Sequence, residues 1–77
     1  MTRKDIITGS DIEINVRNNA SPYEIGQEIV RQSARTWIER TNNKKLTPTE
    51  RLHDVRMFEK YAYRYGLQRE LREMGII

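Results

Sequence analysis

The chain has 77 residues, with 14 basic and 11 acidic side chains, a formal net charge of +3 and no cysteine. A chain of this length forms one small domain, here residues 1–77, and buries only ~60% of the surface that its unfolded state exposes. The lack of cysteine excludes a disulfide framework and a thiolate metal site, and with a single histidine we expect neither a metal nor a cofactor.

Residues 5–17 contain the only strand pattern in the chain. Apolar and polar residues alternate over 12–16, which predicts a strand with one buried face. The Gly-Ser pair at 9–10 suits a two-residue hairpin turn. We therefore predict a short hairpin with strands over about 5–8 and 11–16. Its role is open: it either covers the core or offers an edge that pairs with a partner's strand.

The next predicted element is a helix over 22–41. It is preceded by a capping box, Ser-Pro-Tyr-Glu at 21–24, with proline at the first helical position. Apolar residues then recur at steps of three and four on one side of the helix. Trp37 lies at the centre of this apolar stripe, so we expect it to anchor the core. Gly26 lies in the same stripe and suggests the close approach of another backbone.

A second helix is predicted over 48–65. Its start, Thr-Pro-Thr-Glu at 47–50, repeats the capping box, and Phe58 lies on its apolar face. The loop between the two helices is short and polar, which predicts antiparallel packing with Trp37 facing Phe58.

The last element follows a predicted left-handed cap at Gly66, with Leu67 as the apolar residue that folds back. We expect a short helix over 67–74. The predicted fold class is therefore mostly α (α+β): an N-terminal β-hairpin or strand, an antiparallel two-helix hairpin and a short C-terminal helix.

The turn around Gly66 also resembles that of bacterial helix-turn-helix DNA-binding modules. Ala62, the glycine four residues later and the apolar Leu67 form this pattern over about ten residues. The sequence departs from the motif at Arg72, where the motif has a buried residue. The short helix also carries two glutamates, which would face phosphates unfavourably. A capped helix end accounts for the glycine equally well.

No residue pattern predicts catalysis. His53 is the only imidazole, no serine has a nucleophile context, and no glycine-rich loop could hold phosphates. We therefore expect a non-enzyme without a small-molecule substrate. No stretch approaches the ~20 apolar residues of a membrane span, and the N-terminus lacks the apolar run of a signal peptide. We expect a cytoplasmic protein without membrane contact.

The outer side of the second helix is the best candidate for function. Cations one helical turn apart lie opposite its apolar face, a tyrosine lies beside them, and two lysines precede them in the loop. These residues are Lys44, Lys45, His53, Arg56, Lys60, Tyr63 and Arg64. An acidic protein surface and a nucleic-acid backbone would both bind such cations. A plain solvated helix face is the third interpretation.

Aromatic and apolar residues on this helix favour a protein partner. Leu52 and Met57 lie on opposite flanks of the apolar stripe, and tyrosine, methionine and arginine are enriched at interfaces. We predict a small regulator or inhibitor, of the kind found in phages and mobile elements, that docks on a larger protein. The predicted contact residues are Arg56, Lys60, Tyr63 and Arg64.

Two alternatives stay open. The first is a nucleic-acid-binding protein that uses the same helix, through Lys44, Lys45, His53, Arg56, Lys60 and Arg64. The second is a structural homo-oligomer, which would bury Leu52, Met57 or the edge at 12–16 between identical chains.

Overall fold

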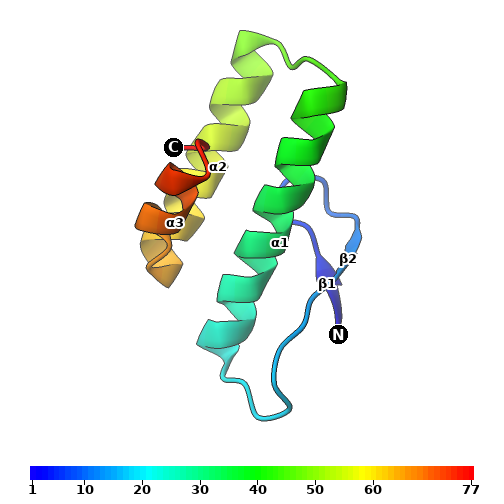
Figure 1. Ribbon diagram of the computed structural model, residues 1–77, viewed down its shortest axis with the longest axis vertical. Helices are drawn as coiled ribbons and strands as arrows, with labels where there is room; N and C mark the ends of the chain where they lie inside the picture. The colour runs from blue at the N-terminus through cyan, green and yellow to red at the C-terminus, as the bar shows by residue number, and fades with distance from the viewer.

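The computed structural model describes residues 1–77 and contains two strands and three helices (Figure 1). The elements are β1 (Thr2–Lys4), β2 (Asp11–Glu13), α1 (Pro22–Asn43), α2 (Pro48–Tyr65) and α3 (Gln68–Glu73). The two long helices run antiparallel, the β1–β2 hairpin lies beside α1, and α3 folds back beside α2 (Figure 1). This arrangement confirms the predicted mostly helical α+β class. No helix has both the length and the apolar content that crossing a membrane requires.

Both long helices begin at a serine or threonine cap followed by proline. The Ser21 hydroxyl accepts a hydrogen bond from the Glu24 N–H, and the Thr47 hydroxyl accepts one from the Glu50 N–H, each at 3.2 Å. Neither glutamate completes the box by accepting from the backbone N–H of its cap residue. The Glu50 carboxylate accepts from the Thr47 hydroxyl at 3.0 Å, whereas the Glu24 carboxylate is bound by Arg17. The caps therefore set the helix starts in both cases.

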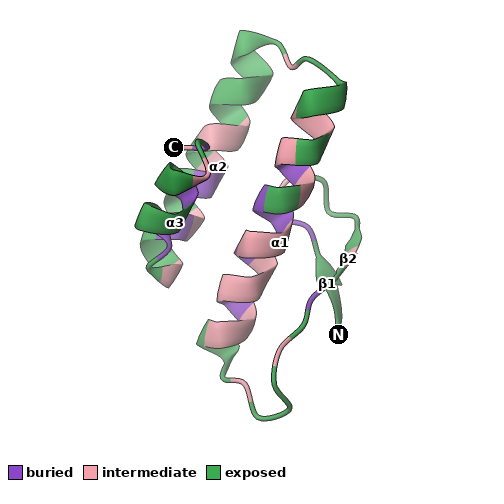
Figure 2. Ribbon diagram, in the orientation of Figure 1, coloured by how far each residue is buried: buried purple, intermediate pink, exposed green.

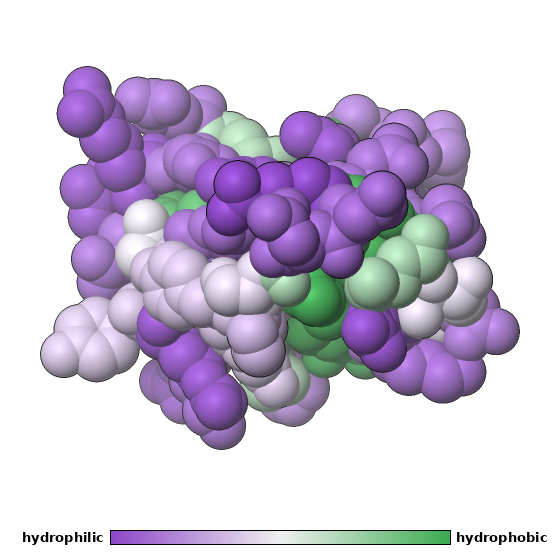
Figure 3. All heavy atoms as spheres, turned by 90° about the horizontal axis from the view of Figure 1, so that it is seen from below, coloured by the Kyte–Doolittle hydropathy of each residue, from purple (hydrophilic) through white to green (hydrophobic).

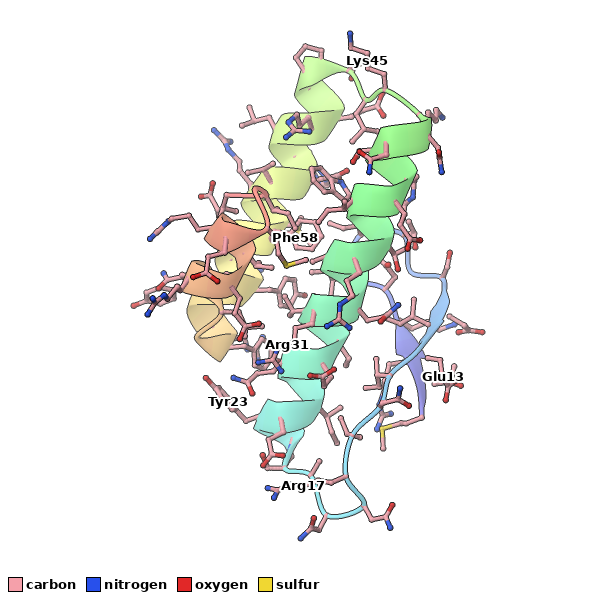
Figure 4. The ribbon with its side chains drawn as sticks, viewed as in Figure 1. Glu13, Arg17, Tyr23, Arg31, Lys45 and Phe58 are labelled. Atoms are coloured by element: carbon pink, nitrogen blue, oxygen red, sulfur yellow. The ribbon has the colours of Figure 1, made fainter.

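The core lies between α1 and α2. Trp37 and Phe58 meet edge to face, with ring centroids 5.6 Å apart, and both are buried. Figure 4 shows Phe58 between the two helices. The Trp37 indole N–H donates to Asp54 Oδ2 at 2.9 Å, which satisfies its polar group. The full set of buried hydrophobic residues in this cluster is Val30, Ala34, Trp37, Phe58, Ala62, Leu67, Leu71 and Ile76.

The hairpin is present, but its first strand lies earlier than predicted. β1 pairs antiparallel with β2, and residues 5–10 form the connecting loop, so the predicted strand over 5–8 and the two-residue turn at 9–10 are wrong. The reason is local. The Asp5 carboxylate accepts from the N–H groups of Ile7 and Thr8 at 2.7 and 3.1 Å, which folds the chain into a turn instead of a strand.

This loop covers the core. Ile6 and Ile7 pack half-buried against the hydrophobic cluster, and the Ile6 N–H donates to the Ser33 hydroxyl at 3.2 Å. Ile14, just after β2, is fully buried, whereas Ile12 is only half-buried. The hairpin therefore contributes to the core mainly through its loop and the residue after β2.

Two glycines lie where α2 meets its neighbours, Gly26 in α1 and Gly66 at the end of α2. Gly26 does allow a close approach, but the group that approaches is the Tyr65 side chain and not a backbone, because a Cβ at Gly26 would overlap the Tyr65 ring. The Gln27 amide also donates to the Tyr65 carbonyl at 3.0 Å. Gly66 has φ +67°, as the predicted left-handed cap requires, and Leu67 is fully buried after it.

Candidate protein-binding surface

α2 has one buried face and one exposed face. Phe58 and Ala62 on the inner face are fully buried. Basic residues on the opposite face are all exposed, and Figure 2 shows the upper half of α2 in the colour of exposed residues. We call these residues the basic stripe: His53, Arg56, Lys60 and Arg64.

Three cations of the basic stripe have no ionic partner. No salt bridge in the structure involves Arg56, Lys60 or Arg64. Outside α2, lysines and arginines are paired more often: Lys4 with Asp11, Arg17 with Glu24, Arg31 with Glu28 and Glu70, and Arg69 with Glu73. Residues 44–65 hold six basic and three acidic side chains, and the rest of the chain holds eight of each. The formal charge of +3 therefore belongs entirely to α2 and the loop before it.

Apolar surface accompanies these cations. A depression of about 390 Å³ lies on the outer face of α2 and is lined by Thr49, Leu52, His53, Arg56, Met57 and Lys60. Leu52 is 52% exposed, which is high for a large aliphatic residue. The aliphatic stems of Arg56 and Lys60 add further apolar surface beneath their charged ends. The depression is therefore both apolar and cationic.

Tyr63 lies farther along the same face and is 79% exposed. It lines a second depression, of about 410 Å³, between α2 and the C-terminal segment, together with Glu59, Gln68, Arg72 and Ile77. Tyr63 therefore does not share the depression that contains Arg56 and Lys60, although it lies on the adjoining surface of the same helix.

Arg64 lies close to a cluster of tyrosines. Its guanidinium carbon is 5.7 Å from the centroid of the Tyr65 ring, which in turn stacks with Tyr61 at 6.4 Å and contacts Tyr23 at 5.7 Å.

Figure 3 shows that hydrophilic residues cover most of the lower end of the molecule, with hydrophobic residues between them near the centre. Of the four predicted contact residues, the structure brings Arg56 and Lys60 into one depression, and it places Tyr63 and Arg64 in separate surroundings.

The two loop lysines differ in position. Lys44 and His53 line a third depression, of about 430 Å³, at the end where α1 and α2 are joined. Lys45 is exposed and points away from the helices at the end of the molecule (Figure 4). The structure therefore connects Lys44, but not Lys45, with the basic stripe.

His53 has a carboxylate neighbour. Its Nδ1 atom is 3.4 Å from Asp54 Oδ1, and the other oxygen of Asp54 accepts from the Trp37 indole. The Asp54 carboxylate is therefore held by a core residue. No group of three or more His, Cys, Asp or Glu side chains is arranged to hold a metal ion.

Sequence reasoning missed an ionic cluster between α1 and α3. Arg31 of α1 donates to both oxygens of Glu70 of α3, at 2.8 and 2.9 Å, and also to Glu28 at 2.7 Å (Figure 4). The hydrogen bonds from Arg31 lower the pKa of the Glu70 carboxyl below its ordinary value, and the bond to Glu70 raises the pKa of Arg31. No sequence signal could identify the pair, because the two residues are 39 positions apart.

In a helix-turn-helix module, α3 would be the helix that contacts DNA. α3, the helix after the turn, has only six residues, and its Glu70 is held against α1 by Arg31.

Comparisons with protein-family models, curated proteins and solved structures found no match to this chain. The outer face of α2 therefore provides the main basis for a functional proposal.

Proposed function

We propose that this chain is a non-enzymatic protein-binding module that docks on a larger protein through the outer face of α2. In this proposal it is a small cytoplasmic regulator or inhibitor of the type that phages and mobile elements encode. The observation that carries the proposal is the exposed Leu52 side chain beside two unpaired cations, Arg56 and Lys60. Covering apolar surface contributes ~25 cal/mol per Å², so a partner that covers this patch is favoured.

The residue types on this face support a protein partner. Tyr63 and Met57 belong to the side-chain types enriched at the centres of protein interfaces, and so does Arg56. Tyr63 projects far enough from α2 to fill a pocket on a partner, since most of its side chain is exposed. The unpaired cations would then orient the encounter and raise its rate.

Affinity capture from an extract of the source cells tests this proposal. The wild-type chain is compared with Leu52→Asp and Tyr63→Ala, and with the control Arg35→Ala, which changes an exposed cation on α1. We expect at least one protein to be retained by the wild type and the control, lost with Leu52→Asp and reduced with Tyr63→Ala. Circular dichroism confirms that each variant is folded. If no retained protein depends on Leu52, the proposal is wrong.

Nucleic-acid binding is the second candidate, and the concentration of the whole net charge in residues 44–65 favours it. Its contacts would be Lys44, Lys45 and the basic stripe. Fluorescence anisotropy with random-sequence duplex and single strands, at low and physiological salt, tests it. Micromolar binding that weakens steeply with salt would put nucleic acid first. Arg64→Glu would weaken both functions, whereas Tyr63→Ala would weaken protein binding more.

A homo-oligomer is the third candidate, and light scattering on the free chain tests it. A symmetric dimer through the outer face of α2 would bring two basic stripes together, and like charges in contact are unfavourable. We therefore expect a monomeric mass. A dimeric mass that Leu52→Asp converts to a monomer would favour this candidate over the other two.

A further inference from the structure

We propose that the partner segment is an acidic amphipathic helix that lies along the outer face of α2. This inference rests on the proposed function and specifies the chemistry of the partner. It follows from one juxtaposition: the unpaired Arg56 and Lys60 lie one helical turn apart in the same depression, with Leu52 and Met57 on either side of them.

The axial spacing of the cations fits a helix. Residues four positions apart on a helix are separated by about 6 Å along its axis. Arg56, Lys60 and Arg64 repeat at this interval. Carboxylates at every fourth position of a partner helix repeat at the same interval, so two or three ion pairs can form in register. Such pairs favour one alignment of the two helices over others.

The apolar flanks distinguish this partner from nucleic acid. At 100° per residue, Leu52 and Met57 are separated by about 140° around the axis of α2, so they lie on the two sides of the cations. Apolar residues beside the carboxylates of an amphipathic helix would cover both side chains. A phosphate backbone offers no apolar surface, so it would leave the exposed Leu52 and the half-buried Met57 uncovered.

A second copy of this chain does not fit this description. A suitable copy would have to present free carboxylates on a helix. Four of the seven glutamates of its helices are bound within the chain: Glu24 to Arg17, Glu28 and Glu70 to Arg31, and Glu73 to Arg69. The other three, Glu39, Glu50 and Glu59, are nine or more positions apart, so they cannot form a row of carboxylates one helical turn apart. The acidic partner is therefore a different chain.

Synthetic peptides test the inference directly. The probe is a helical peptide of about five turns, roughly 18 residues, with glutamate at every fourth position and leucines beside the glutamates. Two matched peptides replace each glutamate by glutamine or by lysine. Calorimetric titration against the full chain at physiological salt should show the glutamate peptide binding about tenfold more tightly than the glutamine peptide, because two or three ion pairs, each modest at an exposed surface, together reach about this factor.

Reversing two charges in the protein tests whether Arg56 and Lys60 themselves pair with the peptide. Arg56→Glu combined with Lys60→Glu should weaken binding of the glutamate peptide about tenfold and should create binding of the lysine peptide. Arg3→Glu combined with Arg35→Glu is the control, because it makes the same change in net charge at exposed positions outside α2. The control should leave both affinities nearly unchanged. Circular dichroism establishes that both double variants are folded.

Three results would overturn the inference: no binding of the glutamate peptide up to millimolar concentration, equal binding of the glutamate and glutamine peptides, or equal effects of the two charge reversals. These results are distinct from failure of the proposed function. If a captured protein depends on Leu52 but the glutamate peptide does not bind, the binding function stands and the acidic-helix inference is wrong. If no captured protein depends on Leu52, the proposed function itself is wrong.

Discussion

The polar faces of α1 and α2 differ in what their charges contact. On α1, Glu24 is bound by Arg17, and Arg31 is bound to both Glu28 and Glu70. On α2, Arg56 and Lys60 have no ionic partner. The reason is position. α1 lies between the hairpin and the other two helices (Figure 1), so Glu24 and Arg31 reach neighbouring segments, although its Arg35, Glu39 and Arg40 form no ion pair. The outer face of α2 has no such neighbour (Figure 1). Two helices that begin with the same sequence pattern therefore differ in how their charges are neutralised.

The largest predicted effect comes from removing the ring that joins the two helices. Phe58→Ala should lower the free energy of unfolding by about 3–5 kcal/mol, because Phe58 is fully buried against Trp37. Tyr63→Ala is the matched control on the outer face of the same helix, and it should change stability by less than about 0.5 kcal/mol. Urea unfolding measures both. Similar losses for the two variants would contradict the division of α2 into a buried and a free face.

A smaller effect is expected where α1 closely contacts the end of α2. Gly26→Ala should destabilise the chain by about 1–2 kcal/mol, because overlap with the Tyr65 ring outweighs the gain in helix propensity. In a Tyr65→Ala background the added methyl group has room, so the same substitution should be neutral or stabilising. A double-mutant cycle by thermal or urea unfolding checks this coupling. Additive effects would show that Tyr65 is not the limiting contact.

The ion pair between α1 and α3 should make stability depend on pH. The pKa of Glu70 is lower in the folded chain than its ordinary value of 4.5, so the unfolded chain binds more protons between the two values. Stability from this pair is therefore complete above pH 4.5 and is lost as the pH falls through the lower folded value. Glu70→Gln should cost about 0.5–1 kcal/mol at neutral pH and flatten the acid limb of the stability curve. Parallel curves for wild type and variant would contradict this assignment.

The smallest effect is expected on the outer face of α2. Arg56→Ala and Lys60→Ala should each change the free energy of unfolding by less than about 0.5 kcal/mol, because neither side chain has an ionic partner to lose. Arg31→Ala, which breaks one ion pair within α1 and one between α1 and α3, serves as the comparison. If Arg56→Ala destabilised the chain as much as Arg31→Ala, the contrast between the two polar faces would not hold.

The sequence predicted the local features of this fold well. The starts of α1 and α2 follow from caps at Ser21 and Thr47, and the end of α2 follows from Gly66. The facing of Trp37 and Phe58 follows from helical periodicity and the short connection between the helices. The predicted position of the first strand is wrong because the Asp5 carboxylate accepts from the N–H groups two and three residues ahead. These hydrogen bonds fold residues 5–8 into a loop, although their apolar pattern predicts a strand.

The candidate site was predictable only in part. Periodicity alone places Arg56 and Lys60 on the outer face of α2, and the structure agrees. Periodicity does not show that Arg64 turns toward Tyr65, or that Leu52 stays exposed beside the cations. Those outcomes depend on the neighbours that the fold brings to each side chain, which periodicity does not describe.

The sequence by itself determined where the two long helices begin, where α2 ends and which helix faces are apolar, because these features depend on residues at most four positions apart. Tertiary structure decided which charges are neutralised within the chain and which are free. The Arg31–Glu70 pair spans 39 positions, so it requires α2 to pack against α1 and α3 to pack against α2. The unpaired cations of α2 are the ones that this packing leaves without a partner.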